Sequence, residues 1–298
     1  MNMPANKQTY PASGDQDATP AAIDGAQVAI GDGFSAQSFR ARDVGSAMDP
    51  LVLVDHYVMT EPTFGTHPHA GLSAVSLILE DSEGRFHNRD SLGNDFDLLP
   101  GDLYWLKAGR GAIHNESPRQ GARTHGLQVF VNVGQALRFD APESLLVRRR
   151  DMPLIQTDAH RVRVAMGRSN GVIGAEAPGL PMTILDGELG ALGEFRHVLP
   201  AGHNAWVHAI DNAIDVANAQ HRTRLKPGQA IAINNASGSA SDSVHVMGDN
   251  RRNSRFVIFA GQAVQEPFVQ QGPFVMGSIE EINTATNAYN AGEFGAIA

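Results

Sequence analysis

Two short segments carry residue types and spacings that could bind a metal ion. His67 and His69 are separated by one residue, and His114 and Glu116 have the same spacing. Side chains alternate between the two faces of a β-strand, so the members of each pair share a face, about 7 Å apart along the chain. If the two segments are neighbours in a barrel, three imidazoles and one carboxylate surround one ion. This donor set favours iron, manganese, cobalt, nickel, copper or catalytic zinc over calcium or magnesium.

The same residues also allow a purely structural interpretation. A single histidine pair of this spacing often arises by chance, and a histidine on a half-buried strand is commonly held by hydrogen bonds without any metal. The metal interpretation depends on both pairs occurring together, each beside a turn. A loop with Pro62 and Gly65 leads into the first pair, and a Gly-rich turn at Gly109–Gly111 precedes the second.

The elements that must position these pairs have the pattern of short β-strands. Leu51–Val54, Leu103–Leu106 and Leu127–Val133 are apolar or alternating runs. Turn signals separate such runs about every 8–12 residues, which is typical of an all-β sandwich or barrel. The run after Gly71 is apolar on both faces. Continuing the alternation from the histidines predicts that the face with the ligands also carries Ser73, Val75, Leu77 and Leu79.

The second half of the chain repeats this pattern. Strand-like runs recur from Arg161 to Gly261, and Pro227-Gly228 precedes one of them as Pro100-Gly101 does in the first half. We therefore expect a second copy of the fold. Its histidines do not form pairs of the ligand spacing, and His203 and His208 fall on opposite faces of a straight strand, so we expect them to be structural.

Composition and turn signals divide the chain into five segments. Ser278 and Glu281 form a capping box, and helical spacing continues from there to Gly292, which predicts a short helix near the C-terminus. The expected segments are a flexible tail at 1–25, a first barrel with the metal site at 26–137, a linker at 138–160, a second barrel without metal at 161–262, and a C-terminal tail whose helix packs back on the barrels at 263–298.

The composition excludes several classes of protein. The 298 residues suffice for two domains, and a hydrophobic content of 42% excludes disorder of the whole chain. A net charge of −9 argues against a nucleic-acid surface, which needs clustered lysine and arginine. The absence of cysteine excludes disulfides, thiolate metal sites and cysteine nucleophiles. Residues 1–25 lack the pattern of a signal peptide or membrane anchor, so we expect a cytoplasmic protein without direct membrane or nucleic-acid binding.

Several long motifs resemble one known family. The chain is similar to the pirins, members of the cupin superfamily, from about Val28 to Gly295. The runs that carry the resemblance are His67–Gly71, Arg89–Asn94, Pro100–Trp105, Ala108–Glu116 and, in the tail, Glu266–Met276.

The resemblance implies an all-β chain of two cupin barrels (double-stranded β-helix, jelly-roll) in tandem with a short C-terminal helix. It also implies one mononuclear metal in the first barrel only, most often Fe(2+), with manganese, nickel, cobalt, copper or zinc as alternatives. The ligands of the family correspond to His67, His69, His114 and Glu116 here, the same four residues that the spacing indicates.

Two positions depart from the pattern of the family. Pirins commonly have arginine after the second histidine and glutamate three residues further on, whereas Ala70 and Ser73 stand here. We expect the mouth of the pocket to have lost a charge of each sign. The metal site should survive, because Glu116 is the expected fourth ligand, and the substrate range should differ.

The resemblance implies an enzyme as the first hypothesis. Some pirins open the ring of a flavonol such as quercetin with O2, as quercetin 2,3-dioxygenases do. In that reaction the flavonol binds the metal through its 3-hydroxyl group and Glu116 accepts the proton as the catalytic base. Phe64, Phe130 and Trp105 are candidate walls of the pocket, although Trp105 and Phe130 also suit plain core packing.

Two other hypotheses stay open. In the first, the iron is a redox-responsive centre and the protein binds and regulates a transcription factor or a metabolic enzyme, as pirins are reported to do. The acidic charge makes a protein partner more suitable than DNA. In the second, the same barrel holds zinc and acts as a hydrolase or isomerase, since one fold supports many chemistries.

Overall fold

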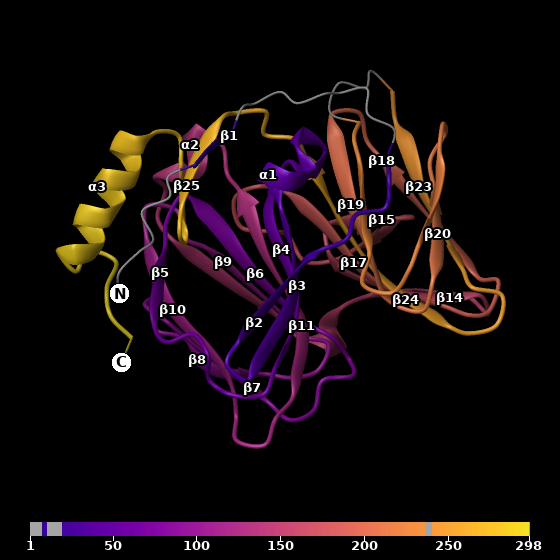
Figure 1. The fold of residues 1–298 in the computed structure, drawn as a ribbon, viewed down its shortest axis with the longest axis horizontal. Helices are drawn as coiled ribbons and strands as arrows, with labels where there is room; N and C mark the ends of the chain where they lie inside the picture. The colour runs from indigo at the N-terminus through magenta and orange to yellow at the C-terminus, as the bar shows by residue number, and fades with distance from the viewer. Residues whose placement is uncertain (1–7, 11–19, 236–239, 298) are drawn as a thin grey trace.

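The computed structural model describes residues 8–10, 20–235 and 240–297, which are mainly β-strand (Figure 1). The first barrel consists of two packed antiparallel sheets, in the orders β12-β9-β6-β11-β4-β3-β2 and β5-β10-β7-β8. Its strands are β2 (Ala26–Ile30), β3 (Phe34–Arg40), β4 (Leu51–Met59), β5 (His67–His69), β6 (Leu72–Ile78), β7 (Phe86–Asp90), β8 (Asp95–Leu98), β9 (Leu103–Lys107), β10 (Ala112–Pro118), β11 (Thr124–Asn132) and β12 (Glu143–Val147).

The second barrel has the same two-sheet plan, which confirms the expected tandem of barrels. Its sheets run in the orders β13-β14-β17-β24-β19-β22 and β18-β23-β20-β21, beside the short hairpin β15-β16. The strands are β13 (Leu154–Gln156), β14 (His160–Met166), β15 (Arg168–Ser169), β16 (Val172–Ile173), β17 (Met182–Leu189), β18 (Glu194–Leu199), β19 (His203–Asp211), β20 (Ile214–Ala217), β21 (Arg222–Leu225), β22 (Ala230–Ile233), β23 (Asp242–Gly248) and β24 (Ser254–Gln262).

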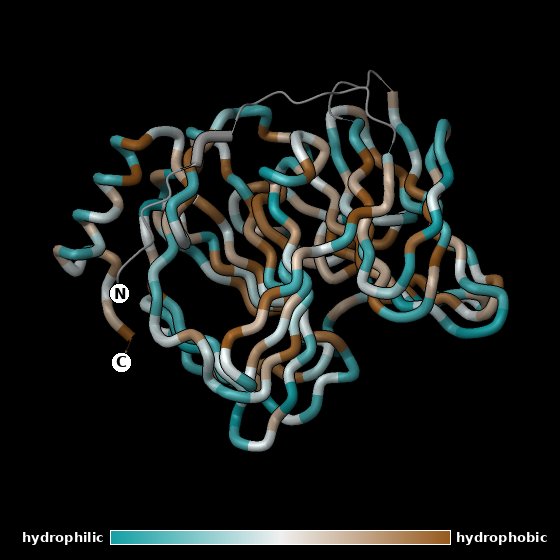
Figure 2. The backbone as a smooth tube through the Cα atoms, in the orientation of Figure 1, coloured by the Kyte–Doolittle hydropathy of each residue, from teal (hydrophilic) through white to brown (hydrophobic). Residues whose placement is uncertain are grey.

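A continuous apolar core joins the two barrels. Val54 and Val129 face outward from the first barrel and belong to the same buried cluster as Trp206 and Phe259 of the second. The ring of Phe39 meets that of Trp206 edge to face, with ring centroids 5.2 Å apart. Figure 2 shows hydrophobic residues along the strands between the barrels and hydrophilic residues in the outer turns. Burial of this shared apolar surface holds the barrels together.

The C-terminal segment returns to the first barrel (Figure 1). Strand β25 (Phe268–Gln271) pairs with β26 (Phe274–Met276) and with β1 (Gln8–Tyr10). Helix α3 (Ile279–Asn290) follows, and Ser278 caps it by accepting a hydrogen bond from the Glu281 amide at 3.2 Å. The predicted C-terminal helix is therefore confirmed, and it packs on the first barrel.

Short helical segments complete the described chain. They are α1 (Ala41–Val44), α2 (Gln135–Arg138) and the 3-10 turns η1 (Ser46–Met48) and η2 (Arg149–Asp151). Among the helices of the described residues, none has the length and apolar character needed to cross a lipid bilayer.

The domain boundaries drawn from the sequence remain predictions. Most of the expected tail at 1–25 lies outside the described residues, and β1 falls within it. Strands β12 and β13 both fall within the expected linker at 138–160, where they pair with strands of the first and the second barrel respectively.

The predicted facing of β6 is wrong. Val75 and Leu77 belong to the core between the barrels, not to the face with the histidines. The cause is Gly71, whose φ of 73° turns the chain out of the β5 sheet into the β6 sheet and interrupts the alternation. Ser76 therefore faces the histidine side, where its hydroxyl contacts Glu116.

Candidate metal centre

Strand pairing brings the two predicted ligand segments together. Strands β5 and β10 are antiparallel neighbours, with His114 directly opposite His67 and Ala112 opposite His69. Directly paired residues point to the same face of a sheet. The three imidazoles therefore extend from adjacent strands into the interior of the first barrel.

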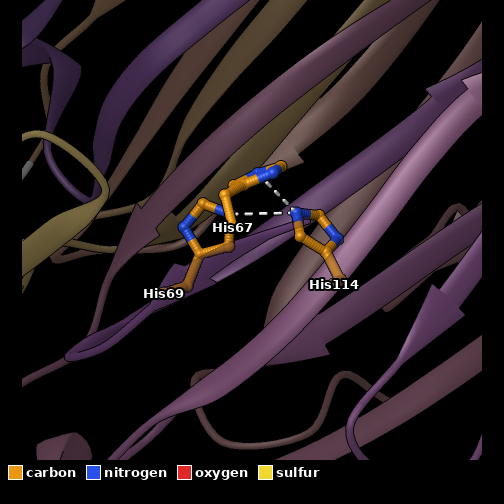
Figure 3. A group of neighbouring side chains, drawn as sticks. All are labelled: His67, His69 and His114. Carbon is orange, nitrogen blue, oxygen red and sulfur yellow. Dashed lines mark hydrogen bonds between the residues drawn. The ribbon is translucent and has the colours of Figure 1, made fainter. Parts of the chain in front are cut away.

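The three rings converge through their Nε2 atoms (Figure 3). The Nε2 atom of His114 lies 2.9 Å from that of His67 and 3.0 Å from that of His69. Their potential ligand atoms all lie within 4.8 Å of one another, and within the described residues this is the one group of three or more such side chains. The predicted histidine cluster is thus present.

The second ring nitrogens show that this cluster fits a metal. Nδ1 of His67 donates to the Gly65 carbonyl at 2.8 Å, and Nδ1 of His69 donates to the Pro273 carbonyl at 3.3 Å. Each ring then has an unprotonated Nε2 whose lone pair points at the centre of the cluster. His114 can donate from Nε2 to only one of these two lone pairs. A metal cation placed among the three Nε2 atoms would accept a lone pair from each of them.

Burial keeps the imidazoles in the form that binds metals. It lowers the pKa of His67 below its ordinary value and lowers the pKa values of His69 and His114 well below theirs, because the charged form is poorly solvated. The neighbouring imidazoles add to the effect at His69 and His114. All three rings are neutral at pH 7 and free to act as ligands.

Glu116 lies beside the histidine cluster but not within it. Both carboxylate oxygens accept hydrogen bonds from the Ser76 hydroxyl, at 2.8 and 2.9 Å, and one oxygen is 3.8 Å from Nδ1 of His114. Burial, together with the charge of Asp90, raises the pKa of Glu116 to about 7, although the hydrogen bond from Ser76 opposes this. The carboxyl group therefore stands next to the centre, turned toward Ser76.

A cavity of about 320 Å³ opens onto the cluster. Phe64 and Phe130 line it, and the ring of Phe130 meets that of His69 edge to face at a centroid distance of 5.1 Å. Phe130 thus lines the cavity, as proposed, and also packs against a buried apolar cluster. Trp105 is fully buried in the core between the barrels and does not line the cavity.

Sequence reasoning missed Ser76, the hydrogen-bond partner of Glu116, and several residues that line the cavity. Ser76 interrupts the apolar run of β6, and this polar interruption was the available signal. Gln128 and Tyr57 line the wall from β11 and β4, and Pro273 lies on the rim. Pro273 comes from a segment more than 200 residues away along the chain from the histidine it contacts, so local sequence patterns carry no signal for it.

The two departures from the family pattern lie away from the mouth of the pocket. Ala70 is fully buried against Phe274 and Ile282 in the core under helix α3, and Ser73 is fully buried as well. Neither residue lines the cavity. The expectation that these positions change the charge at the mouth is therefore wrong, because both side chains lie in packed parts of the molecule and not in the cavity.

Comparison with known sequences gives matches in both halves of the chain. A family model described as Pirin matches residues 27–131, and a second model, described as Pirin C-terminal cupin domain, matches residues 184–295. Human Pirin is 30% identical over 239 residues, which are 80% of this chain and 80% of that protein. A pirin-like protein from Solanum lycopersicum is 28% identical over 273 residues, which are 89% and 88% of the two chains.

Solved structures show the same arrangement of barrels. A quercetin 2,3-dioxygenase from Acinetobacter baumannii aligns with a TM-score of 0.80 at 25% identity, over 94% of this chain and 100% of that one. A bacterial pirin from Escherichia coli in complex with nickel(II) aligns with a TM-score of 0.59 at 16% identity, over 87% and 100% of the two chains. At this low identity, the similarity to the Escherichia coli pirin shows a shared fold only.

Proposed function

Because the chain belongs to the pirin family, with both of its cupin domains, we propose that it is a metal-dependent dioxygenase that opens a flavonol such as quercetin with O2. The histidine cluster at the end of an aromatic-lined cavity carries this proposal. The similarity to a protein described as quercetin 2,3-dioxygenase supports the substrate class.

The proposed ligands are the three histidines and Glu116. The Nε2 atoms of His67, His69 and His114 already converge, and the carboxylate of Glu116 is adjacent to them. Fe(2+) is the proposed ion, and manganese, nickel, cobalt, copper and zinc suit the same donors. When bound, such a metal supplies Lewis acidity toward the flavonol oxygens and access to O2 chemistry.

Glu116 is also the proposed catalytic base. A flavonol must lose its 3-hydroxyl proton before it is electron-rich enough to react with O2, and a carboxylate oxygen of Glu116 takes that proton. The Ser76 hydroxyl donates to both oxygens of this carboxylate and holds it at the side of the cluster. Ser76 is therefore a positioning residue for the base.

The aromatic walls of the cavity suit a flat phenolic substrate. Phe34, Phe64 and Phe130 provide apolar faces, while Gln128 and Asp55 provide polar groups for ring hydroxyls. The apolar walls also keep bulk water from the reacting oxygens, which strengthens the electrostatic interactions of Glu116. The proposed partners are thus a small aromatic substrate and O2.

A second candidate function is a redox-sensing iron protein that regulates a transcription factor or a metabolic enzyme by binding it. The contact between Nδ1 of His69 and the carbonyl of Pro273 favours it. This contact links a proposed ligand directly to the turn between β25 and β26. A change of one unit in the charge of the iron would therefore act, through His69, on the turn between β25 and β26, which lies outside the barrel wall.

The test is turnover of quercetin in air by protein reconstituted with ferrous iron, with the metal content measured beforehand. Loss of the flavonol absorbance is compared with that of His69→Ala, which removes one ligand, and of His245→Ala, which removes a histidine paired with Glu194 in the second barrel. We expect His69→Ala to lose both metal and turnover and His245→Ala to retain both. Absence of turnover by fully loaded wild-type protein rejects the dioxygenase proposal and favours the redox-sensing candidate.

A further inference from the structure

One of the proposed metal ligands is oriented by the C-terminal segment of the chain. Nδ1 of His69 donates to the Pro273 carbonyl at 3.3 Å, and Pro273 lies in the turn between β25 and β26. Such an outer contact fixes the tautomer and the direction of a ligand ring, and its loss typically costs about 10- to 100-fold in metal affinity. The position of this hairpin therefore bears directly on His69.

The hairpin touches the end of β5 through a short backbone contact. The Val275 amide donates to the Ala70 carbonyl at 3.0 Å, and Ala70 and Phe274 form an isolated bridge. Apolar packing of Phe274 and Met276 under helix α3 adds to this contact. Because apolar packing has no preferred direction, the angle of the turn also depends on the polar contacts at the two flanks of the hairpin.

Arg138 of α2 contacts both flanks of the hairpin. Its side chain is 1% exposed, and Nη2 lies 3.7 Å from a carboxylate oxygen of Glu266, which precedes β25. Nη1 lies 3.7 Å from a carboxylate oxygen of Glu281 in α3, which follows β26. Nη2 also donates to the Val133 carbonyl at 3.2 Å. One guanidinium group, here called the hairpin clamp together with its two carboxylates, thus ties both flanks to the first barrel.

Backbone amides fix the two carboxylates of the clamp. The Gln135 amide at the start of α2 donates to Glu266 at 2.8 Å, and the Gly277 amide at the end of β26 donates to Glu281 at 2.7 Å. A Cβ atom at Gly277 would lie 2.5 Å from Nη1 of Arg138. The guanidinium group therefore lies directly against the backbone where the hairpin ends, and these contacts have defined directions.

The burial of its charge makes the clamp resist displacement. Arginine keeps its charge in a folded protein. Burial lowers the pKa of Arg138, and the carboxylates of Glu281 and Glu266 oppose this shift. A movement of the hairpin that carries either carboxylate away leaves a buried charge with less compensation, which is costly.

We propose that Arg138 is a positioning residue of the metal centre, because it holds the β25-β26 hairpin at both flanks and so keeps the Pro273 carbonyl on Nδ1 of His69. This inference rests on the metal ligands of the proposed function. It adds a residue that does not line the cavity and acts on the centre only through the hairpin.

The test uses the full chain, labelled with ¹⁵N in its histidines, with zinc as the probe metal. Zinc affinity is measured by competition with a chelator, and ¹H–¹⁵N correlation spectra of the zinc-loaded protein report the Nδ1 protons. In Arg138→Met we expect the zinc affinity to fall about tenfold or more and the Nδ1 proton of His69 to exchange faster with water. The Nδ1 proton of His67 is the internal reference, because its acceptor is the local Gly65 carbonyl at 2.8 Å, and it should not change.

Arg255→Met is the matched control for a general loss of stability. Arg255 also bridges two carboxylates, Asp211 at 2.6 Å and Asp81 at 2.9 Å, and it lies away from the hairpin. We expect both Arg→Met substitutions to lower the unfolding temperature and only Arg138→Met to weaken zinc binding. Arg138→Lys keeps the charge and should recover part of the lost affinity.

Three results would overturn the positioning role while leaving the proposed function intact. These are an unchanged zinc affinity in Arg138→Met, equal changes in exchange at His67 and His69, and an equal loss of affinity in Arg255→Met. If Arg138→Met does not fold, Glu281→Gln removes one charge of the clamp, and it should likewise speed exchange at His69 and not at His67. Failure of the wild-type protein to bind zinc rejects the metal ligands themselves, and with them both the proposed function and this inference.

Discussion

At the residue scale, the chemistry of this protein depends on which nitrogen of each imidazole carries a proton. Backbone carbonyls hold Nδ1 of His67 and His69 and so leave Nε2 unprotonated toward the cavity. At the barrel interface, Asp81, His125, His56 and His208 instead follow one another at hydrogen-bond distance. The atom that the second ring nitrogen contacts thus decides what the first nitrogen can do: His67 and His69 turn a free lone pair to the cavity, whereas His56, His125 and His208 contact one another.

Glu116→Gln separates the two proposed roles of this residue. A glutamine cannot accept the proton, so we expect turnover of quercetin to fall about 100-fold or more while the histidines retain the metal. Metal content and turnover are measured on the same samples. If the metal is lost together with activity, Glu116 is chiefly a ligand.

Ser76→Ala tests the positioning of that base. Removing the hydroxyl leaves the carboxylate without the hydrogen bonds of 2.8 and 2.9 Å that hold it. We expect kcat to fall about tenfold, less than in Glu116→Gln, with an unchanged metal content. Unaltered kcat in Ser76→Ala would exclude a positioning role for this hydroxyl.

At the scale of elements, the turn at Gly71 decides which face of β6 points toward the histidine cluster. Its φ of 73° sends the chain from β5 into β6, and the C-terminal strand β26 packs directly on it. A Cβ atom at this position would lie 1.9 Å from the carbonyl oxygen of Val275. The chain at the end of β5 and the C-terminal hairpin can approach each other this closely only because residue 71 has no side chain.

Gly71→Ala should therefore separate β5 from the C-terminal hairpin. We expect a loss of about 2 kcal/mol or more in the free energy of unfolding, together with weaker metal binding. Thermal unfolding and metal content measure the two effects. Gly121→Ala is the matched control, because its φ of 74° is similar and nothing lies within 4 Å of the added atom. Equal effects of the two substitutions would show that backbone conformation, not the contact with Val275, is responsible.

At the scale of the whole molecule, buried neutral histidines make the stability depend on pH. His197 in the second barrel is 4% exposed and contacts the Ser169 hydroxyl at 3.1 Å. Burial and the nearby His203 lower its pKa from 6.5 to about 4. The unfolded chain therefore binds a proton more readily than the folded one below about pH 6.5. The stabilisation is complete above that pH and is lost progressively as the pH falls toward 4.

His197→Asn should flatten this acid dependence. In wild-type protein, this one residue accounts for a decrease of about 2 kcal/mol in the free energy of unfolding between pH 6.5 and 5. Denaturant unfolding at several pH values measures the slope, which should be shallower in the variant. A variant slope equal to that of wild type would refute the contribution of His197.

The sequence alone determined the features that depend on local periodicity. Alternation of side chains places His67 with His69 and His114 with Glu116 on shared faces, and the capping residue Ser278 marks the start of helix α3. These features need only the geometry of a single strand or helix, so the pattern of neighbouring residues is sufficient. The repeated strands and turns likewise indicated two barrels.

Only the tertiary structure decided the features that depend on contacts between distant segments. Glu116 turns toward Ser76, Ala70 packs under helix α3, and Phe130 lines the cavity. His208 belongs to a chain of histidines that starts in the other barrel. Each of these depends on strand register, on the turn at a single glycine or on the docking of two barrels. Such long-range packing is not encoded in the spacing of neighbouring residues.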